Sequence, residues 1–209
     1  MDSIPVCAEI NENIADSEIF TAYLTAARAK AFHKASACKG KAEELLAEAA
    51  LENIRRDDAL FELFAKAAGR EKISFGTLKK EYQAENIRRK EKKAEGKTVY
   101  GLTSFTLARY IRYVTDNMKA SVLESLKSSG AFETDDESLE KFYGTVSGTD
   151  PLFRAEDGGV KPLGDVRAKV SFLYEEYILN ERLGAVMKNQ RVKTDKDAVR
   201  ETTAKFLKY

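Results

Sequence analysis

The side chains best suited by type and spacing to do chemistry are the lysines and arginines between residues 70 and 97. This stretch contains ten Lys or Arg residues and five Glu residues, a local charge of +5 in a chain whose net charge is +1. On a helix, residues four apart adjoin, so Arg88 and Lys92 would lie on one face. Arg89 and Lys93 would then lie on the neighbouring face. Cations at this spacing can contact successive phosphates, and each contact releases a counterion, so the pattern predicts a nucleic-acid-binding helix.

Aromatic and cationic side chains follow the basic stretch directly. Tyr100, Tyr110 and Tyr113 alternate with Arg109 and Arg112 over fourteen residues. Planar rings and guanidinium groups stack on unpaired bases, which a duplex does not offer. We therefore expect a single-stranded nucleic acid, RNA above all. The predicted nucleic-acid-binding residues are Lys79, Lys80, Arg88, Arg89, Lys92, Lys93, Lys97, Arg109 and Arg112.

A second interpretation of the basic stretch needs no ligand. Glu85 precedes Arg88 by three residues and Arg89 by four, the spacing at which charges on a helix pair with one another. Internal salt bridges would then explain part of the pattern, and the remaining charges would be a solvated helix face.

Enzymatic and metal chemistry have little support in the sequence. The single histidine, His33, has no nearby nucleophile or orienting group, and Cys7 and Cys38 are too far apart to form a metal-ligand pair of usual spacing. The acids around 135–140 match no calcium loop, and the glycine-rich stretch 144–159 matches no nucleotide-binding motif. We expect no catalytic residue, metal or cofactor.

The elements that must position these residues are mostly helices. Apolar residues recur at helical spacing, and only three prolines interrupt the chain. The longest stripe is formed by Leu107, Ile111, Val114, Met118, Val122 and Leu126. The predicted helices cover about 16–38, 41–56, 57–68, 77–95, 104–127, a short segment after 134, 165–188 and 194–207.

These elements predict an all-α protein, a single-domain bundle of about six to eight helices with helices 105–127 and 165–188 as its central pair. Residues 1–15 are predicted to be a flexible N-terminal arm, and residues 16–209 the helical domain. Five of the twelve glycines and two of the three prolines fall within 144–164, which predicts a long loop there. In the helix 165–188, the residues expected to face inward are Val166, Val170, Leu173, Tyr177 and Ile178.

Composition limits the setting in which the protein works. The first residues carry acids and lack a basic, then apolar, secretory signal, and no stretch approaches the roughly 20 apolar residues that span a bilayer. We therefore expect a soluble protein of the cell interior, in the cytoplasm. A net charge of +1 provides no overall field to attract a polyanion, so any nucleic-acid site must be local.

Short motifs along the chain resemble, in their order, those of coat proteins of flexuous filamentous plant viruses. They are Tyr-Gly-Leu at 100–102, Leu-Ala-Arg-Tyr at 107–110, Leu-Phe at 152–153 and Asp-Gly-Gly at 157–159. The likeness covers fewer than fifteen positions. The spacing after Tyr113 departs from that family, and the chain before residue 70 lacks its usual signatures. The resemblance implies a helical protein that holds single-stranded RNA in a groove.

The sequence thus favours a non-enzymatic, nucleoprotein-like protein that binds or coats single-stranded RNA. The alternative is a helical adaptor or scaffold that binds protein partners, or copies of itself, through the charged helix and the glycine-rich loop. An enzyme with an unfamiliar site is a third class.

Overall fold

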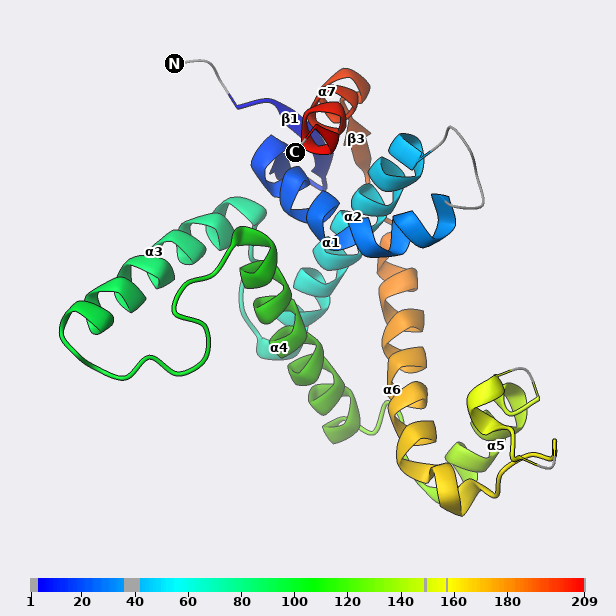
Figure 1. Cartoon of the computed structure of the whole chain (residues 1–209). Helices are drawn as coiled ribbons and strands as arrows, with labels where there is room; N and C mark the ends of the chain where they lie inside the picture. The colour runs from blue at the N-terminus through cyan, green and yellow to red at the C-terminus, as the bar shows by residue number, and fades with distance from the viewer. Residues whose placement is uncertain (1–3, 36–41, 149, 157, 209) are drawn as a thin grey trace.

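The computed structural model describes residues 4–35, 42–148, 150–156 and 158–208, without the side chains of 29–35. Within these residues the chain forms seven α-helices, one short 3-10 helix and three short strands (Figure 1). The elements are β1 (Val6–Ile10), β2 (Asn13–Asp16), α1 (Ser17–Ala35), α2 (Ala42–Ala68), α3 (Phe75–Ala94), α4 (Leu107–Ser128), α5 (Asp136–Val146), η1 (Pro151–Phe153), α6 (Leu163–Met187), β3 (Val192–Thr194) and α7 (Lys196–Leu207). This confirms the predicted all-α, single-domain helical bundle, to which a small sheet is added.

The prediction of a flexible N-terminal arm over 1–15 is wrong for residues 6–15. β1 pairs antiparallel with β2 on one side and with β3, almost 190 residues later, on the other. The turn between β1 and β2 consists of Asn11 and Glu12, both with positive φ, as tight hairpins require. Cys7, Ala8 and Ile10 are buried against the helices. The strands are short and their partner is distant, so the local pattern did not reveal them.

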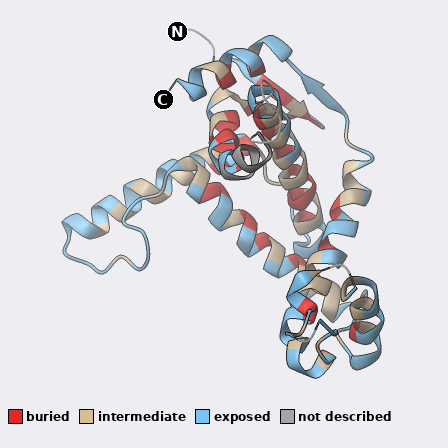
Figure 2. Ribbon diagram, turned by 45° about the vertical axis from the view of Figure 1, so that its right-hand side comes forward, coloured by how far each residue is buried: buried red, intermediate tan, exposed pale blue. Residues whose placement is uncertain are grey.

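The buried residues lie mainly where the N-terminal sheet, α1, α2 and the first turn of α3 meet (Figure 2). α2 is the central element, because it packs against α1, α4, α6 and α7. The predicted central pair of 105–127 and 165–188 is therefore incorrect, since α4 and α6 each pack mainly against α2 and meet one another only over a short stretch, where Lys127 pairs with Glu175. The predicted helices 41–56 and 57–68 are one helix. Asp57 and Asp58 lie inside it instead of starting a new one.

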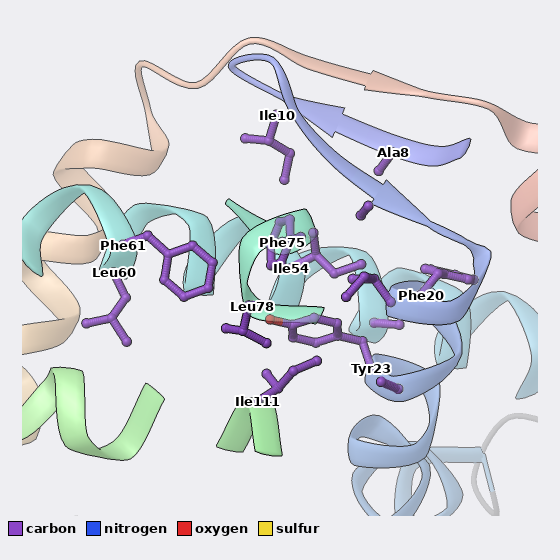
Figure 3. Packing of buried hydrophobic residues seen from close by; sticks show 14 of the residues in the cluster. Ala8, Ile10, Phe20, Tyr23, Ile54, Leu60, Phe61, Phe75, Leu78 and Ile111 are labelled. Carbon is purple, nitrogen blue, oxygen red and sulfur yellow. The ribbon is translucent and has the colours of Figure 1, made fainter. Parts of the chain in front are cut away.

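Phe75 anchors α3 in the main core (Figure 3). Its ring makes edge contacts with Phe61 at 5.3 Å and with Tyr23 at 6.1 Å between ring centroids. The predicted stripe on α4 is confirmed at its centre: Ile111 is buried in the same cluster, as are Met118 and Val122. The remaining members of the stripe, Leu107, Val114 and Leu126, are half-buried against it.

A second, smaller core lies at the far end of α6, where Leu139 of α5, Phe153 of η1 and Val170 of α6 pack together. The predicted loop 144–164 therefore contains structure: α5 continues to Val146, and η1 places Phe153 in this core. On α6 the buried residues are Val170, Leu179 and Leu183, whereas Tyr177 is 47% exposed and its predicted inward position is incorrect. The N-terminal caps of α5 and α7 are Asp135 and Asp195.

Asp57 should make the stability of the protein fall as the pH rises. Desolvation raises its pKa to about 6, and the hydrogen bond from the Tyr23 hydroxyl, 2.7 Å, only partly opposes this. A carboxyl group with a raised folded-state pKa stabilises the fold when protonated, and this contribution is lost as the pH rises through about 6. Between pH 4 and pH 7 the loss should be about 1–3 kcal/mol.

Asp57→Asn removes this titration and keeps an acceptor for Tyr23. Urea unfolding at several pH values should show the variant more stable than the wild type at pH 7, with the difference shrinking towards pH 4. Carboxylates whose pKa is lowered, such as Glu85, contribute equally to the pH dependence of both proteins. Their contribution therefore cancels when the two stabilities are compared. A difference that does not change with pH would contradict the burial of the Asp57 charge.

Candidate nucleic-acid interface

The predicted basic helix exists as α3, and it leaves the body of the protein (Figure 1). Ser74 caps its first turn, and Phe75 and Leu78 are its only buried residues. From residue 79 to residue 109 no residue is buried (Figure 2). The chain turns at Gly96 and returns along the helix to α4. We call residues 79–106 the α3 projection.

The charge of α3 is strongly asymmetric. Its twenty residues contain seven Lys or Arg and three Glu, which gives a net charge of +4. A polar helix that extends from a body is typical of an element that contacts a partner or solvent on most sides. The structure thus carries the predicted positive charge on an accessible element.

Lys79 is occupied by the fold. Its ammonium group lies 2.9 Å from a carboxylate oxygen of Asp16 and 2.5 Å from one of Glu18, and its side chain is only 16% exposed. Partial burial opposes the charge, but the hydrogen bonds to Glu18 and Asp16 outweigh it and raise the pKa of Lys79. The residue ties α3 to the end of β2 and the start of α1, so it is a poor phosphate ligand.

Arg89 is also a structural residue. Its Nε lies 2.6 Å from Glu85, and its Nη1 donates to the carbonyl oxygens of Tyr100, at 3.1 Å, and of Leu102. The guanidinium group lies 4.7 Å from the ring centre of Phe105, and the side chain is 12% exposed. The predicted face shared by Arg89 and Lys93 is therefore divided, because Arg89 points into the returning loop.

Glu85 holds two arginines at once. Arg88 donates from Nε and Nη2 to its two carboxylate oxygens, at 2.8 Å each, in addition to the contact with Arg89. Although partial burial raises it, the pKa of Glu85 is lowered overall because both guanidinium groups stabilise the carboxylate. The internal salt bridges that the spacing allowed are present, and Arg88 itself stays about half exposed.

The remaining predicted cations differ in their availability. Lys97 pairs with Glu95 and Arg112 with Asp116, all at exposed positions. Exposed pairs of this kind are worth little, so a phosphate can compete for the cation. Within the described residues, no ion pair is found for the other four predicted residues, which are Lys80, Lys92, Lys93 and Arg109.

The predicted aromatic residues, like the predicted cations, differ in their accessibility. Tyr110 is buried in a ring cluster with Tyr82 at 5.9 Å and Phe105 at 5.6 Å, so it cannot stack on a base. Tyr113 lies at the edge of this cluster and is 53% exposed, and Tyr100 is 86% exposed. The structure thus leaves two of the three predicted tyrosines accessible.

Sequence reasoning did not identify the residues that fasten the loop. The side-chain amide of Asn86 makes two hydrogen bonds to the backbone of Phe105, at 2.8 and 2.9 Å. It also did not predict the cavity of about 850 Å³ at the root of the α3 projection, lined by α1, α7, Tyr82 and Leu107 among others. For the residues that fasten the loop, the sequence offered one weak indication. This was the spacing of Glu85 and Arg89, which allows the two side chains to pair on a helix.

The described residues contain no group of three or more His, Cys, Asp or Glu side chains able to hold a metal ion. None of the described helices combines the length and apolar character needed to cross a bilayer. Cys7 is a free, buried thiol 3.6 Å from the Thr202 hydroxyl. Cys38 and the side chain of His33 lie outside the described residues.

Comparisons with family models, with curated proteins and with solved structures gave no match. The likeness to filamentous plant virus coat proteins therefore rests on the short motifs alone, of which Asp157 lies outside the described residues.

Proposed function

We propose that the chain is a non-enzymatic nucleic-acid-binding protein of the cell interior, and that single-stranded RNA is its ligand. The observation that carries this proposal is the α3 projection: a helix of net charge +4 that extends from the body with no buried residue beyond Leu78. Positive charge on an exposed helix attracts the phosphate backbone of any nucleic acid.

Among the predicted cations, the four without ion pairs define the length of the contact. Lys80 and Lys93 are thirteen residues apart on α3, about 20 Å along its axis at 1.5 Å per residue. A single-stranded nucleic acid that follows the helix over this distance would place several of its phosphates against it. Arg109 adds a cation at the start of α4, beside the root of the α3 projection, where Tyr110 contacts Tyr82. The expected binding is independent of base sequence, because these groups reach phosphates and not base edges.

A titration of the wild-type protein tests the proposal. Binding of a labelled single-stranded RNA oligonucleotide is followed by fluorescence anisotropy between about 50 and 200 mM salt. The logarithm of the binding constant should fall linearly with the logarithm of salt concentration, with a slope of about −0.7 per neutralised phosphate. Four unpaired cations predict a slope of about −3. Adding Arg88, Lys97 and Arg112 predicts about −5.

Lack of measurable binding at about 50 mM salt would overturn the proposal. A slope steeper than about −6 would require Lys79 and Arg89 as well and would contradict their structural role. Because the chain has no tryptophan, co-purified nucleic acid would also stand out in the ratio of absorbance at 260 and 280 nm.

The adaptor function remains the alternative, and one observation favours it. Ile87 is 59% exposed on α3, and Leu102 is 41% exposed on the returning loop. Exposed apolar side chains on a projecting helix are a common feature of protein-binding elements. An adaptor would show no salt-dependent RNA binding in the titration above, so the same measurement separates the two functions.

A further inference from the structure

The loop that returns from α3 to α4 is held in one conformation by three side chains of α3. Arg89 binds the carbonyl oxygens of Tyr100 and Leu102, and Glu85 holds Arg89 in place. Asn86 clamps the end of the loop through both backbone hydrogen-bonding groups of Phe105. Phe105, at the end of the loop, packs against the core. The stretch before it contains no buried residue and has little reason to be fastened by Arg89 unless it presents something.

The residue that this fastening presents is Tyr100. Its backbone carbonyl is fixed by Arg89, and Gly101, with φ +79°, makes the turn that follows. Its side chain is 86% exposed, and within the described residues no hydrogen bond or ring contact involves the phenol. A large ring held in water on a fixed backbone contributes nothing to the fold.

Tyr100 lies beside the cations that the proposed function uses. It contacts Arg89 through its carbonyl, and Lys92 and Lys93 follow Arg89 by three and four residues, about one helical turn or 5.4 Å along the axis. A strand whose phosphates lie on Lys92 and Lys93 would therefore have its bases within reach of the Tyr100 ring.

We infer that Tyr100 is the residue that selects single-stranded nucleic acid, by stacking on an unpaired base, and that Arg89 is the positioning residue that holds it for this contact. The inference rests on the proposed function and explains how the protein would prefer single strands to duplexes. The lysines attract single strands and duplexes alike, whereas a ring can stack only on a base that has left its pair. Arg89 thus acts through the loop and not on a phosphate.

Binding of single-stranded RNA and of duplex RNA to two substitutions at Tyr100 tests the stacking role. Tyr100→Ala should weaken single-strand binding by roughly 5- to 150-fold, the range found for loss of one stacked base. Its duplex affinity and its salt slope should not change, because no charge is altered. Tyr100→Phe keeps the ring and should bind like the wild type.

Arg89→Lys tests the positioning role. The substitution keeps the charge, but an ammonium group cannot reach both carbonyls as the guanidinium fork does. Single-strand affinity should fall towards that of Tyr100→Ala, while the duplex affinity and the salt slope stay at wild-type values. A fall in both affinities together would instead show that Arg89 is a phosphate ligand.

A spectroscopic readout follows from the absence of tryptophan in the chain. Tyr100→Trp introduces a single indole whose fluorescence should be quenched when an unpaired base stacks on it, and left unchanged by duplex RNA. Phe172→Trp, at a position on α6 that is 54% exposed, is the matched control and should not respond. If RNA binds the wild type and Tyr100→Ala equally well, the inference fails and the proposed function stands. If no nucleic acid binds, both fail.

Discussion

Replacing Asp58 with alanine is expected to lower the free energy of unfolding by about 3–5 kcal/mol, the usual result of removing one partner from a buried ion pair. Asp58 is fully buried in the middle of α2, yet three donors surround its carboxylate. They are the ammonium group of Lys72 at 2.7 Å, the amide of Asn13 at 2.8 Å and the amide of Gln190 at 3.1 Å.

The effect should be large because Asp58 joins segments that are far apart in the chain. Asn13 belongs to β2, Lys72 to the link between α2 and α3, and Gln190 to the segment before β3. Asn13 also accepts a hydrogen bond from the backbone N–H of Phe75, so the same cluster fixes the first residue of α3. Without the carboxylate, a partly buried lysine and the amide of Asn13 lose an acceptor at once, and the amide of Gln190 keeps only the carbonyl oxygen of Arg55.

Urea unfolding monitored by circular dichroism measures the loss. Glu62→Ala is the matched control, because Glu62 lies one turn further along α2 and pairs with the exposed Lys66 at 2.6 Å. An exposed pair is worth less than about 1 kcal/mol, so the control should unfold nearly as the wild type does. Asp58→Ala and Lys72→Met should also be non-additive, since each removes the same contact. Equal, small effects of Asp58→Ala and Glu62→Ala would show that the cluster does not hold the fold together.

The Asp58 cluster also explains where prediction from the sequence failed. Two consecutive aspartates resemble the start of a helix, because carboxylates cap helix N-termini and favour the first turn. Here α2 continues through them, since the partners that satisfy Asp58 come from positions 45 residues earlier and 132 residues later. The spacing of apolar residues along a helix is a local signal. It was sufficient to predict α4, where Ile111, Met118 and Val122 form a continuous buried stripe. The buried carboxylate depends on distant contacts that no local pattern contains.

The candidate interface likewise contains features that the sequence could predict and features that depend on distant contacts. Composition was enough to locate the positive charge on α3, because a helix carries its residues in a regular order. It could not separate Arg89 from Lys93, which lie four residues apart and look equivalent on a helix. The difference arises from the path of the loop, whose carbonyls at Tyr100 and Leu102 meet Arg89. Loop paths depend on turn geometry and on distant contacts, so the structure was needed to show which cations are free.

The distinction between cations that bind the loop and cations that are free determines which variant tests RNA binding most directly. Reversing the charge of the four predicted cations without ion pairs, by Lys80→Glu, Lys92→Glu, Lys93→Glu and Arg109→Glu together, changes the local charge by eight units. Arg89 is left in place, because its loss would release the loop and confuse a structural effect with an electrostatic one. The variant should bind single-stranded RNA too weakly to measure at about 50 mM salt, since the phosphate contacts become repulsive and no counterions are released on binding.

The fold of this variant should survive, because none of the four side chains is buried or paired in the described structure. A matched control carries the same eight-unit change elsewhere: Lys141→Glu, Arg182→Glu, Lys196→Glu and Lys208→Glu, at exposed positions on or next to α5, α6 and α7. If attraction comes from the α3 projection, the control should retain most of its affinity, apart from the weak, salt-screened effect of distant charge. Equal loss of binding in both variants would mean that only net charge matters and that α3 is not the site. Unchanged binding in the α3 variant would place the RNA on another surface.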